Sequence, residues 1–180
     1  MPNKASYDDG GDDLIADDYA PPANATSQAL KIGLIFGIIA VIVNIALAFL
    51  SVPATTGQAR EATAGPLTYL ALGLACLTFL INCALCFVGG FMAGKRIILR
   101  RPAFWTGVII SAITYIAGFV ERYIPNYPGN LNQQSGNQAI GGIAISLLFL
   151  VIACLIGGIL SQWGATRATL RHPYYGSEED

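Results

Sequence analysis

The chain has 180 residues, of which 54% are hydrophobic and 12% are charged, and its formal net charge is −1 at pH 7. Soluble domains carry about 25% charged residues, so this composition argues against an ordinary soluble domain. No stretch resembles a nucleic-acid-binding patch, a catalytic triad or a phosphate-binding loop, and we expect no nucleic-acid partner.

The N-terminal segment 1–29 is acidic and poor in apolar residues. Six aspartates lie within the first 18 residues, together with Gly and Pro. Such a segment cannot bury enough apolar surface to fold, so we expect a disordered acidic tail. Two roles stay open for it: a solvated tail that the membrane surface repels, or a docking segment for a basic partner.

Four long stretches without any charge follow the tail. Crossing a bilayer takes about 20 helical residues, and each stretch contains an apolar core of about that length. The sequence therefore predicts an all-α integral membrane protein, a four-helix transmembrane bundle within 30–162, followed by a short tail, 163–180. The expected spans are about 30–52, 67–93, 103–121 and 139–162.

Basic residues near the membrane predict the orientation of the bundle. Seven of them lie at one side of the predicted spans and two at the other, and the largest group is in the loop after the second span. Because Lys and Arg favour the cytoplasmic side, we expect both termini and this loop in the cytoplasm. The loop residues that anchor this topology, or hold anionic lipid headgroups, are Lys95, Arg96, Arg100 and Arg101.

Small residues recur at spacings of four along the spans. Helices in lipid associate by close packing, which small residues permit. We expect these residues to form the seam of the bundle, with the small faces of the first two spans in contact inside one hairpin; contact between subunits is the competing use. The helix-packing residues predicted in this way are Gly33, Gly37, Gly89, Gly90, Gly94, Gly157 and Gly158.

Spans two and four share a pattern. Cys86 is followed by a glycine doublet and a Leu-Arg-Arg-Pro end, and Cys154 by a doublet at the same spacing and a Leu-Arg-His-Pro end. This pattern predicts two tandem two-helix hairpins, which would be parallel repeats. Chance similarity between apolar helices is the alternative.

Asn44 and Asn82 are the most polar residues inside the predicted spans. Each is expected to hydrogen-bond across helices, or alternatively to contact a solute. No ionisable residue lies deep in a span, which argues against a proton-coupled carrier or pump. Glu121, at the outer end of the third span, is the nearest carboxylate.

The cysteines are expected to be structural. Cys83 and Cys86 form a C-x-x-C pair, but all four cysteines lie within spans, whereas redox-active cysteines need access to partners and water. The single histidine, His172, lies in the C-terminal tail, so no metal site or haem ligand is predicted. We expect no catalytic residue and no metal, and the sequence implies no cofactor.

These observations favour a non-enzymatic accessory or scaffold subunit of a larger membrane complex. The alternative is a passive carrier or channel for a neutral or apolar solute. A membrane thiol/quinone oxidoreductase ranks third. Expected partners are membrane lipids and other membrane protein subunits, and a homo-oligomer stays open.

Overall fold

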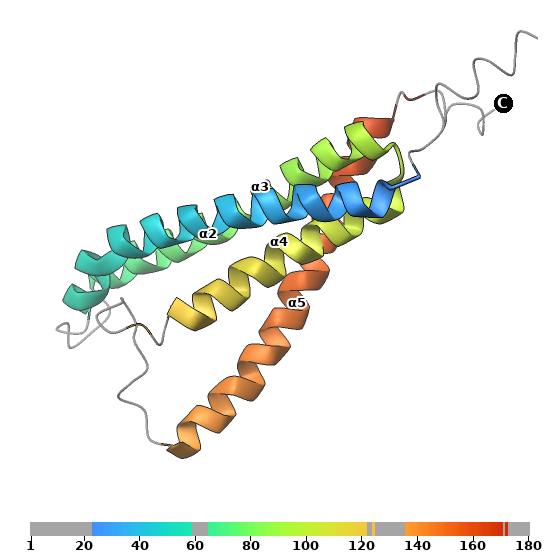
Figure 1. Ribbon diagram of the computed structural model, residues 1–180. Helices are drawn as coiled ribbons and strands as arrows, with labels where there is room; N and C mark the ends of the chain where they lie inside the picture. Colours follow the sequence, from blue (N-terminus) through green and yellow to red (C-terminus); the bar gives the residue numbers. More distant parts are fainter. Residues whose placement is uncertain (1–22, 59–64, 122–123, 125–135, 171, 173–180) are drawn as a thin grey trace, which may run out of the picture.

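The computed structural model describes residues 23–58, 65–121, 124, 136–170 and 172. These residues form four helices (Figure 1): α2 (Ala25–Gln58), α3 (Pro66–Ile97), α4 (Arg100–Glu121) and α5 (Gly136–Thr169). Each helix contains a segment long and apolar enough to cross a membrane. Most of the predicted N-terminal tail and half of the predicted C-terminal tail lie outside the described residues.

Two helices extend into segments that the sequence analysis assigned to the tails. Residues 25–29 belong to α2, and residues 163–169 belong to α5. Ala29 and Ala165 lie in these extensions and are fully buried in one cluster. Both helices continue because their packing against α3 and α4 continues beyond the predicted spans.

The local sequence explains where α3 begins and how it connects to α4. Pro66 occupies the first helical position, where its fixed φ is favourable and its missing N–H is not needed. At the other end only Ile98 and Leu99 separate α3 from α4. Ile98 has a φ of 65°, unusual for a β-branched residue, and its N–H donates to the Gly94 carbonyl at 3.0 Å. This tight reversal returns the chain directly along the bundle.

The helices form a ring in the order α2, α3, α5, α4. α3 packs against α2 and α5, α4 packs against the same two helices, and α3 and α4 make fewer contacts across the middle. The chain runs in one direction along α2 and α4 and in the opposite direction along α3 and α5 (Figure 1). Neighbours from different hairpins are therefore parallel, and the two hairpins lie side by side.

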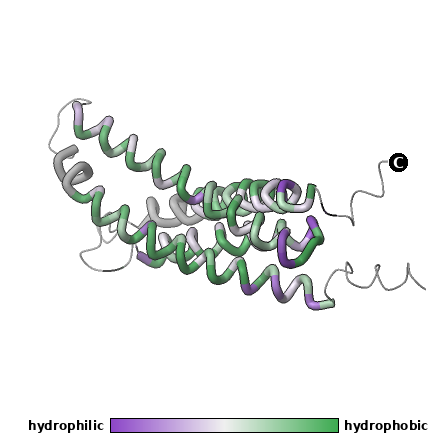
Figure 2. The backbone as a smooth tube through the Cα atoms, turned by 90° about the horizontal axis from the view of Figure 1, so that it is seen from above, coloured by the Kyte–Doolittle hydropathy of each residue, from purple (hydrophilic) through white to green (hydrophobic). Residues whose placement is uncertain are grey.

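Small residues and a few isoleucines are buried between the helices, and most large apolar residues face outward. Ala93 and Ala103 have no exposed surface, whereas Leu50 and Ile42 are 68% and 62% exposed. Hydrophobic residues occur along most of the length of all four helices (Figure 2). A water-soluble protein does not present so much contiguous apolar surface, whereas lipid accommodates it. The fold is therefore that expected of a multi-pass membrane protein.

Burial is confined to one half of the bundle. Among residues whose side-chain environment is described, none is fully buried after Ala40 in α2, before Cys86 in α3, after Ile110 in α4, or before Gly157 in α5. Because the helices alternate in direction, these four limits lie at a similar height. One half of the bundle is closely packed, and in the other half the helices diverge (Figure 1). We call these the packed half and the open half.

Glycines bring the parallel helices into contact in the packed half. A Cβ at Gly33 would lie 3.1 Å from Ile109 Cβ of α4, and one at Gly37 would lie 2.8 Å from Ile113 Cδ1. These contacts join α2 to α4, whereas the sequence analysis expected the small face of the first span to meet that of the second. The ring order explains the difference, since it places a parallel helix of the other hairpin beside α2.

The glycines of α3 likewise face the other hairpin. A Cβ at Gly90 would overlap the backbone of Ser161 in α5, and one at Gly94 would lie 2.7 Å from Ala165 Cα. Only the absence of side chains allows the two backbones to approach this closely. The contact between α2 and α3 is made differently, with the Phe36 side chain of α2 near Gly89.

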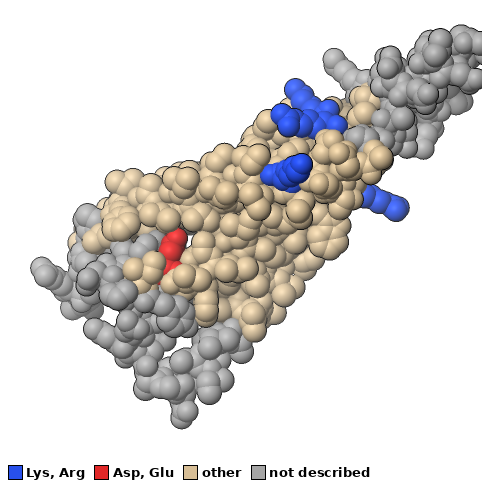
Figure 3. Space-filling view, in the orientation of Figure 1, with Lys and Arg blue, Asp and Glu red and all other residues tan. Residues whose placement is uncertain are grey.

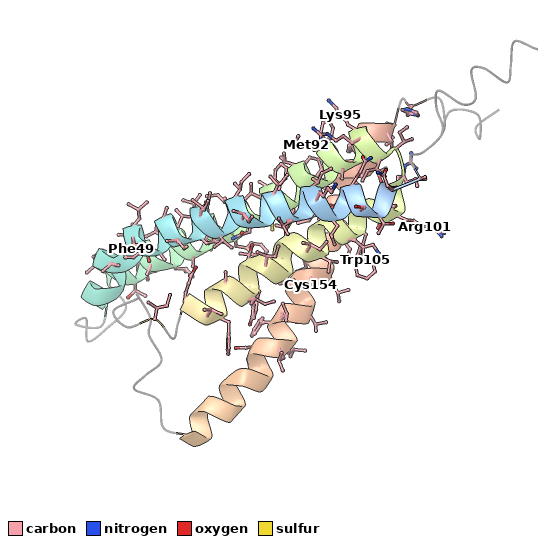
Figure 4. All side chains as sticks on the ribbon, in the orientation of Figure 1. Phe49, Met92, Lys95, Arg101, Trp105 and Cys154 are labelled. Atoms are coloured by element: carbon pink, nitrogen blue, oxygen red, sulfur yellow. The ribbon has the colours of Figure 1, made fainter. Side chains whose placement is uncertain are left out.

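Charge divides the two ends of the molecule. All described Lys and Arg residues lie at the end of the packed half, and the only described acidic residue, Glu121, lies at the other end (Figure 3). Lys95 and Arg101 point away from the helices (Figure 4). We call the end with the Lys and Arg residues the charged end, and the end with Glu121 the open end.

Candidate binding cavity

A reciprocal pair of hydrogen bonds joins α2 and α3 about midway along the bundle. Asn44 Nδ2 donates to Asn82 Oδ1 at 3.1 Å, and Asn82 Nδ2 donates to Asn44 Oδ1 at 3.0 Å. Asn82 Nδ2 also donates to the backbone carbonyl of Thr78 at 2.9 Å. In apolar surroundings an unpaired amide is costly, so this pairing fixes the relative position of α2 and α3.

Both asparagines line a cavity of about 380 Å³, to which all four helices contribute. Its deep end reaches Ile110 and Gly157, at the limit of the packed half, and Glu121 lies at its outer end. Ile110 and Glu121 are eleven positions apart in α4, which corresponds to a length of about 16 Å. The cavity therefore occupies the space left where the helices diverge.

Polar groups from several helices line this cavity. Besides the asparagines they include the hydroxyls of Thr78, Ser111 and Thr114. The Thr78 hydroxyl donates to the Leu74 carbonyl and the Thr114 hydroxyl to the Ile110 carbonyl, each at 2.8 Å. Each donor is thus used within its own helix, while the oxygen lone pairs stay able to accept hydrogen bonds.

Close contacts between α4 and α5 lie beyond the deep end of the cavity. A Cβ at Gly107 would overlap the Gly157 backbone, and a Cβ at Gly158 would lie 2.7 Å from Phe104 Cδ2. The hydroxyl of Ser161, which is fully buried, donates to the Ala103 carbonyl at 2.6 Å. These contacts leave little room between α4 and α5 on the side of the charged end.

Basic residues at the charged end pair with neighbouring groups. Arg100 Nε donates to Thr169 Oγ1 at 3.1 Å, which connects the start of α4 to the end of α5. Lys95 Nζ lies 4.8 Å from the centre of the Phe91 ring, and the Arg167 guanidinium lies 5.8 Å from that of Trp163. Cations over aromatic faces are favourable, and here they keep long basic side chains near the end of the bundle.

The four cysteines are free thiols. The Cys86 sulfur lies 3.7 Å from Ser111 Oγ, and Cys154 Sγ donates to the Val108 carbonyl at 3.8 Å. Cys83 lines the cavity together with Cys86, whereas Cys76 is exposed on α3. No group of three or more metal-ligating side chains occurs among the described residues.

The structure brings some of the predicted residues together and separates others. Asn44 and Asn82 meet at the cavity, whereas the packing glycines lie in the packed half. The four basic residues expected in a loop belong to the last turn of α3 and the first turn of α4, at the charged end. Sequence reasoning placed Ser161 only among the small residues spaced four apart in the fourth span, and it did not identify Thr106. The buried hydroxyls of both donate to backbone carbonyls of neighbouring helices, Thr106 to Ala29 at 3.2 Å. Their signal was a small polar residue within an apolar helix, close to glycines that permit contact.

The fold and the cavity together define the class of this protein: an all-α bundle of four helices able to cross a membrane, packed at one half and containing a partly polar cavity in the other. Comparison with protein-family models, with curated proteins and with solved structures found no match.

Proposed function

We propose that the chain is a non-enzymatic accessory or scaffold subunit of a larger assembly in a membrane, with both termini in the cytoplasm. The observation that carries this proposal is the incomplete packing of the bundle. Leu147, Leu148 and Phe149 of α5 are consecutive, so they point in directions spanning about 200° of the helix circumference, and all three are more than half exposed. This part of α5, with so few neighbours in its own chain, offers a contact surface to another subunit.

The proposed orientation rests on the charge distribution. Lys and Arg favour the cytoplasmic side of a membrane, and the described basic residues gather at the charged end. The start of α2 and the end of α5 lie at that same end, which would put both termini in the cytoplasm (Figure 1).

Site-specific photo-crosslinking tests the proposed subunit role. A photoreactive residue at Leu148, on the open half of α5, is compared with one at Ile35, on the packed half of α2; the two side chains are 60% and 55% exposed. We expect a discrete crosslinked product of higher mass from position 148 and only lipid adducts from position 35. A product containing two copies of this chain would identify a homo-oligomer. Lipid adducts alone at both positions, with the tagged chain purifying alone in mild detergent, would contradict the proposal.

A passive carrier for a neutral or apolar solute is the second candidate, and the polar cavity favours it. Transport would also need a path past the contacts of Gly107 with Gly157 and of Gly90 with Ser161. Single cysteines at positions 44 and 82, in a chain without its native cysteines, test this function through labelling by a water-soluble thiol reagent. If neither position is labelled from either side, the carrier is excluded.

A further inference from the structure

We propose that the cavity between the helices binds an uncharged amphiphile: a molecule with an apolar chain and one hydroxyl, amide or carbonyl group. This proposal is independent of the subunit role, because a bound small molecule and a neighbouring protein are detected by different measurements.

The dimensions of the cavity fit a small molecule with an extended chain. Its volume of about 380 Å³ lies within the range of small-molecule sites, about 300–1,000 Å³. Its length along α4 is about 16 Å, which leaves room for an apolar chain in addition to one polar group. Phe79, Ile156 and Leu160 contribute apolar side chains to its walls, so an alkyl chain would replace open space with favourable contacts.

Polar groups are available near the middle of this length. Asn44 uses one amide hydrogen in the pair with Asn82, and its second amide hydrogen has no partner among the described residues. The oxygen of Thr114 retains lone pairs, since its hydroxyl hydrogen is used by the Ile110 carbonyl. The cavity thus offers a donor from α2 and an acceptor from α4, the two kinds of partner that a hydroxyl or an amide needs.

The charges around the cavity select an uncharged ligand. Among the described residues that line it there is no Lys, Arg or His, and Glu121 is the single acidic one. A carboxylate or phosphate at mid-depth would lose its hydration with no cation to compensate. A ligand cation could approach Glu121 only at the outer end, away from the asparagine pair.

The packing of the bundle indicates how such a ligand enters. Close backbone contacts at Gly107 and Gly90 lie on the side of the charged end, whereas a Cβ at Gly118 or Gly73 would meet nothing within 4 Å. The helices diverge toward the open end (Figure 1). A ligand would therefore enter from the open half and stop at the level of Ile110.

Photolabelling of the full chain in phosphatidylcholine nanodiscs tests the proposal, with a diazirine-bearing dodecyl alcohol as the probe. We expect labelling to concentrate in segments 75–86 and 110–121, which line the cavity. Dodecanol should compete at a concentration about tenfold lower than dodecanoate or dodecyltrimethylammonium, a ratio that corresponds to about 1.4 kcal/mol. Equal competition by the charged compounds would overturn the choice of ligand class. Labelling spread evenly over the outward-facing residues of all four helices would show that the probe merely dissolves in lipid.

Two matched pairs of variants localise the site. Gly118 lines the cavity and Gly73 does not, and both have open space around them, so G118F should lower labelling about tenfold and G73F should leave it unchanged. Thr114 and Thr166 make the same bond to the carbonyl four residues earlier, but only Thr114 lines the cavity. T114V should weaken competition by dodecanol about three- to tenfold, within the usual worth of one hydrogen bond, and T166V should not. Equal effects within either pair would overturn the location, provided that all variants elute as the parent chain does.

Discussion

Asn44 and Asn82 lie on different helices, 38 positions apart, and exchange two hydrogen bonds of 3.1 and 3.0 Å. They lie where the bundle changes from close packing to open space. In the packed half the helices are in contact through backbone atoms and small side chains. In the open half few residues make contacts between helices. The asparagine pair therefore joins α2 to α3 at the point where the close packing of the bundle ends.

Replacing either asparagine with leucine should destabilise the protein, and the two effects should be coupled. We expect a coupling energy of about 1 kcal/mol in a double-mutant cycle, typical of hydrogen bonds between helices in membranes. Each single variant leaves an amide without its partner, so the double variant should cost less than the sum. The free energy of unfolding in mixed micelles measures this coupling. Asn24 supplies the control, because it accepts a hydrogen bond from Gln28 at the exposed start of α2. N24A should therefore change the free energy of unfolding little. Additive effects of N44L and N82L would contradict the pairing.

Glycine-to-alanine substitutions should separate the two halves of the bundle. On α3, G90A would place a Cβ into the Ser161 backbone, whereas G73A meets open space; on α4, Gly107 and Gly118 form the same contrast. We expect G90A and G107A to lower the free energy of unfolding by about 1–3 kcal/mol, the usual cost of overpacking. G73A and G118A should be neutral or stabilising by up to about 1 kcal/mol, because alanine is the better helix former.

Thermal unfolding in detergent measures all four glycine variants under one condition. Equal losses at Gly90 and Gly73 would mean that contact with α5 does not distinguish them. Equal losses at Gly107 and Gly118 would contradict the division between packed and open halves.

The four apolar helices could be predicted from the sequence, because long stretches without charge leave few alternatives to helices in lipid. The helix against which each of them packs could not be predicted. Glycines spaced four apart indicate that another helix approaches closely, but they do not identify that helix. Gly90, for example, meets Ser161 of α5, which lies 71 positions away. The ring order decides the partner, and that order depends on the sum of many contacts along all four helices.

The cavity could be predicted only in part. The two asparagines are conspicuous in apolar helices, whereas Thr114 resembles any threonine that bonds to its own helix. Gly73 and Gly90 are both glycines of α3, and the sequence alone does not distinguish them. Gly73 lies beside open space, whereas Gly90 lies against the backbone of Ser161. Open space is a property of how the helices diverge, and no single residue of the sequence encodes it.

Removing the hydroxyl of Ser161 should weaken the contact between α4 and α5. Its donation to the Ala103 carbonyl at 2.6 Å is fully buried, so we expect S161A to cost about 1 kcal/mol. S161V should cost more, because added methyl groups would meet the glycine contacts around it. T166A is the matched control, since the Thr166 hydroxyl bonds to the Gln162 carbonyl of its own helix. Unfolding in mixed micelles should show almost no change for T166A, and an equal loss for T166A and S161A would argue against a special role for the contact between helices.

The two ends of α4 should be accessible from opposite sides of the membrane. Arg101 is exposed at the charged end, and Glu121 lies at the open end. In a chain whose native cysteines are replaced by serine or alanine, a membrane-impermeant maleimide should label R101C on sealed right-side-out vesicles only after permeabilisation. E121C should be labelled without it. The physical reason is that, in the proposed orientation, Lys95, Arg96 and Arg100 should still favour the cytoplasmic side for the charged end when Arg101 is replaced. The reverse pattern would invert the proposed orientation, and labelling of both positions without permeabilisation would mean that α4 does not cross the membrane.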